Sequence, residues 1–412
     1  MNVKLTTRVK KAILLTLMLS SLLAISVYFD AFGVRSYNPS KSNGFNQSGA
    51  SIVNDEQHYS LLFKAEKPVN FKETDLKFFE TDFLGLLNEI PMRNSNLFVG
   101  IENRGNSCYA DSVIQMLFRI PTVHKIVANL DIYHSRVNLL ISQNNNNNVI
   151  KNIFKGLKIL EGLNHMFYQL QNNEALGATF EFGKSIQCLP GKYADNHQED
   201  ADEYFNFIMT TLKEIIPESQ RHHLLLDISF NGTLKSTLDP HRTELKRQTD
   251  IESRISLPFN GKSDLQSLLD VYFAPETVQL GFDDGTPGSL ERSKKLDNLP
   301  EIIVIQLQRL SIDFEAVSRG AIIRKGDVVD MPELIDFSKC ISAKCSSKST
   351  QYRLKMFVVH SGNHKGGHYY AYSRNNNSWC TLNDSRVTMN EDPVQVKKDQ
   401  ETGYIYFYER IN

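Results

Sequence analysis

A cysteine at the start of a predicted helix is the first residue of this sequence to which chemistry can be assigned. The stretch 100–121 reads GIENRGNSCYADSVIQMLFRIP, with glycines and asparagines crowded just before Cys108. After Cys108 the apolar residues recur at spacings of three and four, which predicts a helix with Asn106 or Ser107 as its N-cap. The positive end of the helix dipole favours a thiolate in the first turn. We therefore expect a lowered pKa for Cys108, although a lone cysteine is more often a small buried side chain.

A histidine segment far downstream supplies a partner for this thiol. Residues 352–388 contain three histidines, and His368 follows Gly366 and Gly367 at the start of a predicted strand, 368–374. An imidazole held there could take the thiol proton and later return it to a leaving amine. His360, at the end of the preceding predicted strand, and His364, in a glycine-rich loop, are the competing candidates.

A third group should orient the imidazole, and the segment LNDS after the single tryptophan offers Asn383 and Asp384. The order cysteine, histidine, asparagine or aspartate is that of papain-like thiol proteases. In an extended strand, neighbouring side chains point to opposite faces. We therefore predict that Asn383 orients His368 and that Asp384 adds a supporting bond.

The elements that must position these residues are helices first and strands later. Helices are expected from Cys108 to about residue 190, with a break at Gln143 and the asparagine run 144–148, and again over 201–212. Period-two patterns predict strands at 225–238, 254–258, 301–310, 352–360, 368–374 and 403–410. This order indicates an α+β fold in which a helical lobe faces an antiparallel sheet.

The composition limits the class of protein. The chain has 412 residues, is 41% hydrophobic and 23% charged, and carries a net charge of −1, so it can bury a full core and shows no charge excess for binding nucleic acid. An odd, widely spaced set of cysteines argues against a disulfide framework and for a reducing compartment. The five are Cys108, Cys188, Cys340, Cys345 and Cys380.

Several segments in order resemble one protease family. The stretch 100–121 resembles the cysteine box of ubiquitin-specific proteases, and 359–388 resembles their histidine box. Between them, QEDADEYFNFIMTTL (198–212), FNGTLKSTL (230–238) and LPEIIVIQLQRL (299–310) resemble further family blocks. The resemblance covers residues 98–412. It implies a papain-like thiol protease fold with a helical thumb, an antiparallel-sheet palm and fingers.

The resemblance also implies roles for single residues. Cys108 matches the family nucleophile, His368 the general base, and Asn383 the third triad position. Asp384 matches the adjacent acidic position, which can share that role. Asn103 matches the asparagine whose side-chain amide completes the oxyanion hole.

The implied substrate is ubiquitin joined to other proteins, cleaved after its C-terminal glycine without a cofactor or metal. Asp200 and Glu203 match positions that pair with the basic tail of ubiquitin, and the loops at Gly366–Gly367 and 311–326 match those that close a slot wide enough for diglycine. Three alternatives remain: a ubiquitin-binding module without catalysis, a protease for a ubiquitin-like modifier, and a secretory papain-like peptidase.

One departure concerns the fingers. Many members of the resembled family carry two CxxC pairs there, which form a four-cysteine zinc site. Here the matching segment after 230–238 reads DPHRTEL, and residues 279–295 contain no cysteine. We therefore expect reduced fingers that lack a zinc site and hold together by packing.

The N-terminus predicts a membrane segment. Residues 12–29 carry no charge and follow Lys4, Arg8, Lys10 and Lys11, which favours an uncleaved anchor within 1–32 over a cleaved signal. Residues 33–97 read as a linker and lead-in. The positive-inside rule would place the catalytic domain in a lumen. We instead expect a cytosolic domain on the endoplasmic reticulum or mitochondrial outer membrane. A catalytic thiol needs a reducing compartment, conjugated ubiquitin is cytosolic and nuclear, and a glycan on the sequon at Asn383 would block the site.

Overall fold

The structure, a computed structural model, describes most of the chain after residue 96. The described residues are 97–103, 105–128, 130–172, 193, 197–259, 261, 263–312, 322–324, 326–347, 349–363 and 366–411. The predicted anchor, the linker and lead-in up to residue 96, Cys188, His364 and most of the loop 311–326 lie outside them. Within these ranges, none of the helices is both long and apolar enough to cross a bilayer.

The chain divides into two compact units, 1–81 with 131–150 and 82–130 with 151–412. The described part of the first unit is 131–150. It contains most of α7 (Leu130–Gln143) and the start of α8 (Asn147–Gln171). The helices are separated at 144–146, inside the predicted break, whereas Gln143 still belongs to α7 and the last two asparagines of the run begin α8. Every candidate site residue belongs to the second unit, which the following paragraphs describe.

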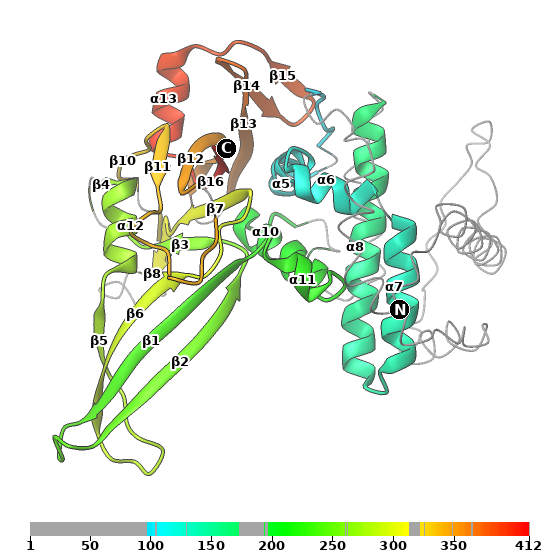
Figure 1. The fold of residues 1–412 in the computed structure, drawn as a ribbon. Helices are drawn as coiled ribbons and strands as arrows, with labels where there is room; N and C mark the ends of the chain where they lie inside the picture. Colours follow the sequence, from blue (N-terminus) through cyan, green and yellow to red (C-terminus); the bar gives the residue numbers. More distant parts are fainter. Residues whose placement is uncertain are drawn as a thin grey trace. The chain divides into compact units, whose positions relative to one another are not determined.

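A large mixed sheet forms the palm (Figure 1). Its strand order is β15-β14-β13-β12-β16-β7-β3, with β11 (Leu334–Asp336) beside β12, and all pairs are antiparallel except β3 with β7. The predicted α+β class is confirmed. The strands are β3 (Ile255–Leu257), β7 (Ile302–Leu307), β12 (Gln351–Asn363), β13 (Gly366–Asn375), β14 (Ser378–Asn383), β15 (Arg386–Thr388) and β16 (Ile405–Arg410), and two short pairs join β4 (Ser263–Asp264) to β10 (Val329–Asp330) and β8 (Leu310–Ile312) to β9 (Ile322–Arg324).

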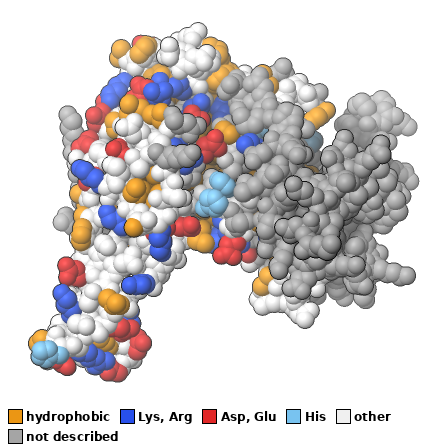
Figure 2. Space-filling view, viewed as in Figure 1, with side chains coloured by type: hydrophobic (Ala, Val, Ile, Leu, Met, Phe, Trp, Pro, Cys, Tyr) orange, Lys and Arg blue, Asp and Glu red, His pale blue; other side chains and the backbone are white. Residues whose placement is uncertain are grey.

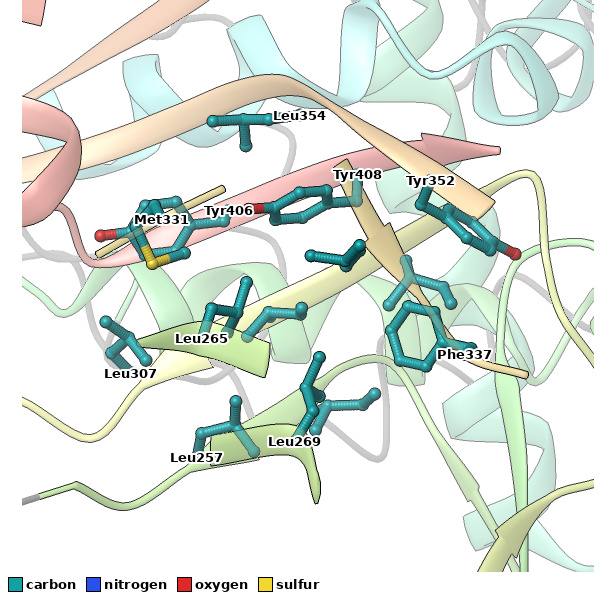
Figure 3. Packing of buried hydrophobic residues seen from close by; sticks show 14 of the residues in the cluster. Leu257, Leu265, Leu269, Leu307, Met331, Phe337, Tyr352, Leu354, Tyr406 and Tyr408 are labelled. Atoms are coloured by element: carbon teal, nitrogen blue, oxygen red, sulfur yellow. The ribbon is translucent and has the colours of Figure 1, made fainter. Parts of the chain in front are cut away.

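The core of the palm fixes the strands that carry the site. Leu265 and Leu269 of α12 (Leu265–Phe273) lie in one cluster with Tyr406 and Tyr408 of β16, all fully buried (Figure 3). The Tyr406 hydroxyl donates to the carbonyl of Gln400 at 2.7 Å, which satisfies its polar end. Each large apolar side chain in such a core contributes roughly 1.5–3 kcal/mol. The cluster therefore holds β16 and β12 rigidly, and β12 in turn pairs with β13.

Helices form the thumb. All residues of α5 (Cys108–Phe118) are buried, and this helix packs against β13 and against α10 (Ala201–Leu212). Tyr109 and Tyr204 meet edge to face across α5 and α10 with ring centroids 5.2 Å apart. The apolar stripe predicted for 201–212 is buried, as expected. The remaining described helices are α6 (Pro121–Ala128), α11 (Glu218–Arg221) and α13 (Pro393–Glu401).

A four-stranded antiparallel sheet forms the fingers, in the order β2-β1-β6-β5 (Figure 1). Its strands are β1 (Leu226–Ser236), β2 (Thr243–Glu252), β5 (Glu276–Gln279) and β6 (Gly288–Leu296). Charged side chains of both signs are scattered over the visible face of the fingers and are densest at the tip (Figure 2). The sequence predicted β1 alone among these strands.

The tip of the fingers has its own small core. Leu234, Phe282 and Leu290 are buried together. Arg242, in the turn between β1 and β2, lies over the Phe282 ring at 4.2 Å and forms an ion pair with Asp284 at 2.8 Å. Since Phe282 and Asp284 lie in the turn between β5 and β6, Arg242 joins the two hairpins. This packing joins the two hairpins of the fingers, and the expected lack of a zinc site stays a prediction.

Truncating Phe282 tests this account of the fingers. We expect Phe282→Ala to remove about 3 kcal/mol of local stability. Faster amide hydrogen exchange should then appear in both hairpin tips, whereas a chelator should leave the exchange of the unmodified chain unchanged. Leu245→Ala, at an exposed position of β2, is the matched control and should have little effect. Chelator-induced exchange in the fingers would contradict the account.

Candidate active site

The loop before α5 is fixed by one asparagine side chain. The Oδ1 of Asn103 accepts hydrogen bonds from the backbone N–H groups of Gly105 at 2.9 Å and Ser107 at 3.3 Å. Gly105 and Asn106 both have positive φ, so the chain turns sharply into the helix. Ser107 is the N-cap, but its hydroxyl reaches Asp111 at 3.0 Å and makes no capping bond. The loop thus delivers Cys108 to the first position of α5.

Burial of the thiol overturns one expectation. Cys108 is only 3% exposed. Burial raises the pKa of its thiol, and this effect outweighs the lowering by the backbone N–H of Tyr369 and the side-chain amide of Gln198. The prediction of a lowered pKa was therefore wrong, because desolvation of the sulfur opposes the helix dipole and the nearby donors.

The imidazole of His368 lies on β13 and is held by Asn383 of β14. Its Nε2 is 2.7 Å from the Oδ1 of Asn383, which accepts the N–H. This bond selects the tautomer and leaves Nδ1 as the nitrogen for the thiol proton. Among the described residues, the hydrogen bonds of the Cys108 sulfur do not include one to His368. His360 lies inside β12 rather than at its end, with its ring stacked on Tyr369 at 4.5 Å.

Asp384 lies between the cysteine loop and the histidine strand. It follows β14 in a left-handed turn with φ of 51°, so the expectation of an extended strand was wrong. Its Oδ2 accepts from the Asn103 amide at 3.2 Å and lies 3.9 Å from His368 Nε2. Its carbonyl accepts from Ile101 at 2.9 Å. The Asp384 carboxylate therefore forms a hydrogen bond with the Asn103 amide and lies farther from the His368 imidazole.

A glycine makes this junction possible. A Cβ at Gly100 would overlap the carbonyl group of Ser385, directly after Asp384. Any larger residue at position 100 would therefore push the cysteine loop away from the turn that follows β14.

The acids at the start of α10 have three different surroundings. Asp200 caps the helix through Oδ1, which accepts from the N–H groups of Asp202 and Glu203, while its Oδ2 accepts from the Tyr404 hydroxyl at 2.9 Å. Asp202 is buried against Arg254, with one oxygen 2.7 Å from the guanidinium, yet burial raises its pKa to about 6. Glu203 is exposed. Of these three acids, the two that are not buried are Asp200 and Glu203, the pair predicted to bind the basic tail.

Two variants test whether these acids bind a basic tail. Asp200→Asn keeps a capping oxygen but removes the charge and the oxygen that accepts from Tyr404, so we expect a slightly lowered melting temperature and a raised KM for a ubiquitin substrate. Glu203→Ala, at an exposed position, should raise KM with an unchanged melting temperature. Normal steady-state kinetics for both variants at moderate salt would mean that the helix start is merely a capped surface element.

The sequence analysis missed one residue of this site. The side chain of Gln198 accepts a hydrogen bond from the backbone N–H of Gly367 at 3.1 Å, donates to the carbonyl of Gly367, and lies 3.8 Å from the Cys108 sulfur. Its position two residues before the N-cap Asp200 was the available signal in the sequence.

Comparison with known proteins agrees with this geometry. The family model for ubiquitin carboxyl-terminal hydrolase matches residues 99–408. The chain belongs to the ubiquitin carboxyl-terminal hydrolase family. The resemblance to ubiquitin-specific proteases is thereby confirmed. The roles of Cys108, His368, Asn383, Asp384 and Asn103 within this family fold stay predictions.

Individual relatives of the family are distant. Ubiquitin C-terminal hydrolase 13 of Arabidopsis thaliana is 27% identical over 327 residues, covering 74% of this chain and 26% of the relative. Ubiquitin carboxyl-terminal hydrolase 5 of Schizosaccharomyces pombe is 24% identical, covering 73% of this chain and 26% of the relative. The chain thus spans about a quarter of the length of these relatives.

A solved structure shares the fold. The Ubp8 deubiquitinase module of SAGA, with Sgf11, Sus1 and Sgf73 and bound to ubiquitin aldehyde, matches with a TM-score of 0.55 at 18% identity. The match covers 85% of this chain and 78% of that chain.

Among the described residues, no cluster of three or more histidine, cysteine or acidic side chains could hold a metal ion.

Proposed function

We propose that this chain is a thiol hydrolase that cleaves the bond after the C-terminal glycine of ubiquitin on conjugated proteins. The observation that carries the proposal is the junction at Asp384. It brings the oxyanion candidate Asn103 and the Asn383–His368 pair to the start of the helix that begins with Cys108. Ubiquitin aldehyde bound to the Ubp8 module supports the same choice of substrate.

The chemistry follows from the protonation states. Because burial raises the pKa of Cys108, the thiol is neutral at rest, and His368 takes the proton as the sulfur attacks the glycine carbonyl. The Asn103 amide stabilises the resulting oxyanion. The carbon–nitrogen bond then breaks, the amine leaves with the proton from His368, and a thioester remains on Cys108. Water, deprotonated by His368, hydrolyses this thioester and releases the ubiquitin carboxylate and the thiol.

A fluorogenic assay tests the proposal. The full chain should release the fluorophore from the C-terminus of ubiquitin, and parallel reactions with ubiquitin-like modifiers determine which modifier is the substrate. Binding of ubiquitin without turnover would instead indicate the non-catalytic module. Turnover of short peptides alone would indicate a general peptidase.

We further propose that residues 12–29 anchor the chain in the endoplasmic reticulum or mitochondrial outer membrane with residues 31–412 in the cytosol. The uncharged run supports the anchor. The free thiols of Cys108, Cys340, Cys345 and Cys380 support a reducing compartment. Asn383 begins a glycosylation sequon, and because it contacts His368, a glycan there would obstruct the site.

Topology has a direct test. Protease added to sealed organelles should digest the catalytic domain, because the domain faces the cytosol, and endoglycosidase should leave the mass of the chain unchanged. A domain that is protected from protease and carries glycans at Asn231, Asn376 or Asn383 would show the opposite orientation.

A further inference from the structure

The side chain of Gln198 covers the nucleophile. Its Nε2 lies 3.8 Å from the Cys108 sulfur, and the cysteine is 3% exposed. A substrate carbonyl must come into contact with that sulfur in order to be attacked. Some group must therefore move before catalysis, and a single side chain moves at lower cost than a helix or strand.

The way in which Gln198 binds β13 resembles the pairing of a peptide group. Its Oε1 accepts the N–H of Gly367 at 3.1 Å, and its Nε2 donates to the carbonyl oxygen of the same residue. Two residues in an antiparallel sheet exchange the same two bonds. A side-chain amide has the donor and acceptor of a backbone peptide group, so it can take the place of one.

Beside Gln198, Gly366 and Gly367 have no strand partner among the described residues on the β13 edge that faces β14. β14 pairs with β13 only from Ala371 to Asn375, and between these segments the backbone N–H of Tyr369 donates to the Cys108 sulfur. On the opposite edge, β12 pairs with Gly366 and Gly367. Gly366 also gives the amide room, because a Cβ there would lie 3.1 Å from the Gln198 Oε1. Extended peptides commonly bind by adding a strand to such an edge.

We propose that the side-chain amide of Gln198 takes the place of a peptide group of the diglycine tail of ubiquitin. Without substrate, this side chain closes the slot over Cys108, and it moves away when the tail pairs with Gly367. The inference rests on the proposed hydrolase function. An entering peptide replaces both hydrogen bonds to Gly367, so the exchange costs a substrate little. A small reagent that cannot pair with β13 gains no such compensation and is excluded from the thiol.

Alkylation of Cys108 by chloroacetamide measures this cover. The pH profile of the reaction gives the rate constant for alkylation of the Cys108 thiolate. For Gln198→Ala in the full chain, we expect this rate constant to rise at least about fivefold because the sulfur becomes accessible. Mass spectrometry of the peptide that contains Cys108 reports the reaction. Gln395→Ala, the same substitution at an exposed position of α13, is the matched control and should react like the unmodified chain.

Two further measurements keep the result interpretable. A melting curve establishes that Gln198→Ala is folded, and Gln198→Asn, whose shorter side chain cannot keep all three contacts, should show the same increase. The pH profile separates the accessibility of the sulfur from the thiol pKa, on which the variant acts in two opposite ways, through the lost Gln198 donor and through the reduced burial. A thiolate rate constant equal to or lower than that of the unmodified chain in both variants would overturn the inference.

The proposed function has a separate readout. Labelling by ubiquitin with a C-terminal electrophile reports on recognition of ubiquitin, whereas chloroacetamide reports on the cover alone. If the chain fails to react with the ubiquitin probe but Gln198→Ala gains alkylation, the proposed substrate is wrong while Gln198 still covers the thiol.

Discussion

Cys108→Ala is expected to reduce hydrolysis of ubiquitin conjugates to the background rate while leaving ubiquitin binding intact. The nucleophile cannot be replaced from within the described part of the chain. Cys340 and Cys380 are buried with raised thiol pKa values, that of Cys340 reaching about 11, and Cys345 packs against the palm core. His368→Ala should lower kcat by about 10²–10⁴-fold, because the buried thiol needs a base to lose its proton.

Turnover assays and a binding assay together check this prediction. Cys108→Ser retains the shape of the side chain with a far weaker nucleophile, so it should bind ubiquitin normally and show no turnover. Cys345→Ala, in a partly exposed loop, is the matched control and should keep full activity. Isopeptidase activity in Cys108→Ala would mean that the assignment of the nucleophile is wrong.

The second large effect concerns Asp384. Because its carboxylate is closer to the Asn103 amide (3.2 Å) than to His368 Nε2 (3.9 Å), we expect it to position the oxyanion donor rather than the base. Asp384→Ala and Asn103→Ala should each lower kcat by about 10²–10³-fold, with smaller changes in KM, as for loss of one oxyanion-hole donor. Asn383→Ala should instead impair proton transfer, since Asn383 holds the imidazole.

Double-mutant cycles separate these roles. If Asp384 acts through Asn103, the double variant of these two residues should lose hardly more activity than either single variant. The losses of Asp384→Ala and Asn383→Ala should instead multiply. The reverse pattern, with coupling between Asp384 and Asn383 and independence from Asn103, would make Asp384 part of the triad.

The long strands with an apolar or alternating pattern could be predicted from the sequence, whereas the solvated strands of the fingers and the short, half-buried β14 could not. β1, β12, β13 and β16 have alternating or apolar patterns and were predicted to within a few residues. β2 reads TELKRQTDIE and is mostly exposed, so it offers no apolar face for a period-two pattern. β6 likewise reads GSLERSKKL. Pairing within the fingers, rather than burial, determines these strands.

The catalytic candidates were predictable by residue type and order, whereas their environment was not. The sequence motifs identified Cys108, His368 and Asn383 as a set, and the structure brings His368 and Asn383 within 2.7 Å. The raised thiol pKa could not be anticipated, because burial depends on the palm and thumb packing around the helix start. Gln198 was missed for a similar reason, since its contacts with Gly367 join residues 169 positions apart in sequence.

The central claim is that Cys108 forms the acyl bond to ubiquitin, and the most direct test is peptide mapping of the full chain after reaction with a ubiquitin electrophile. The account predicts a single adduct on the peptide that contains Cys108, lost in Cys108→Ala and slowed in His368→Ala. An adduct on another cysteine, or none with ubiquitin at any concentration, would contradict it.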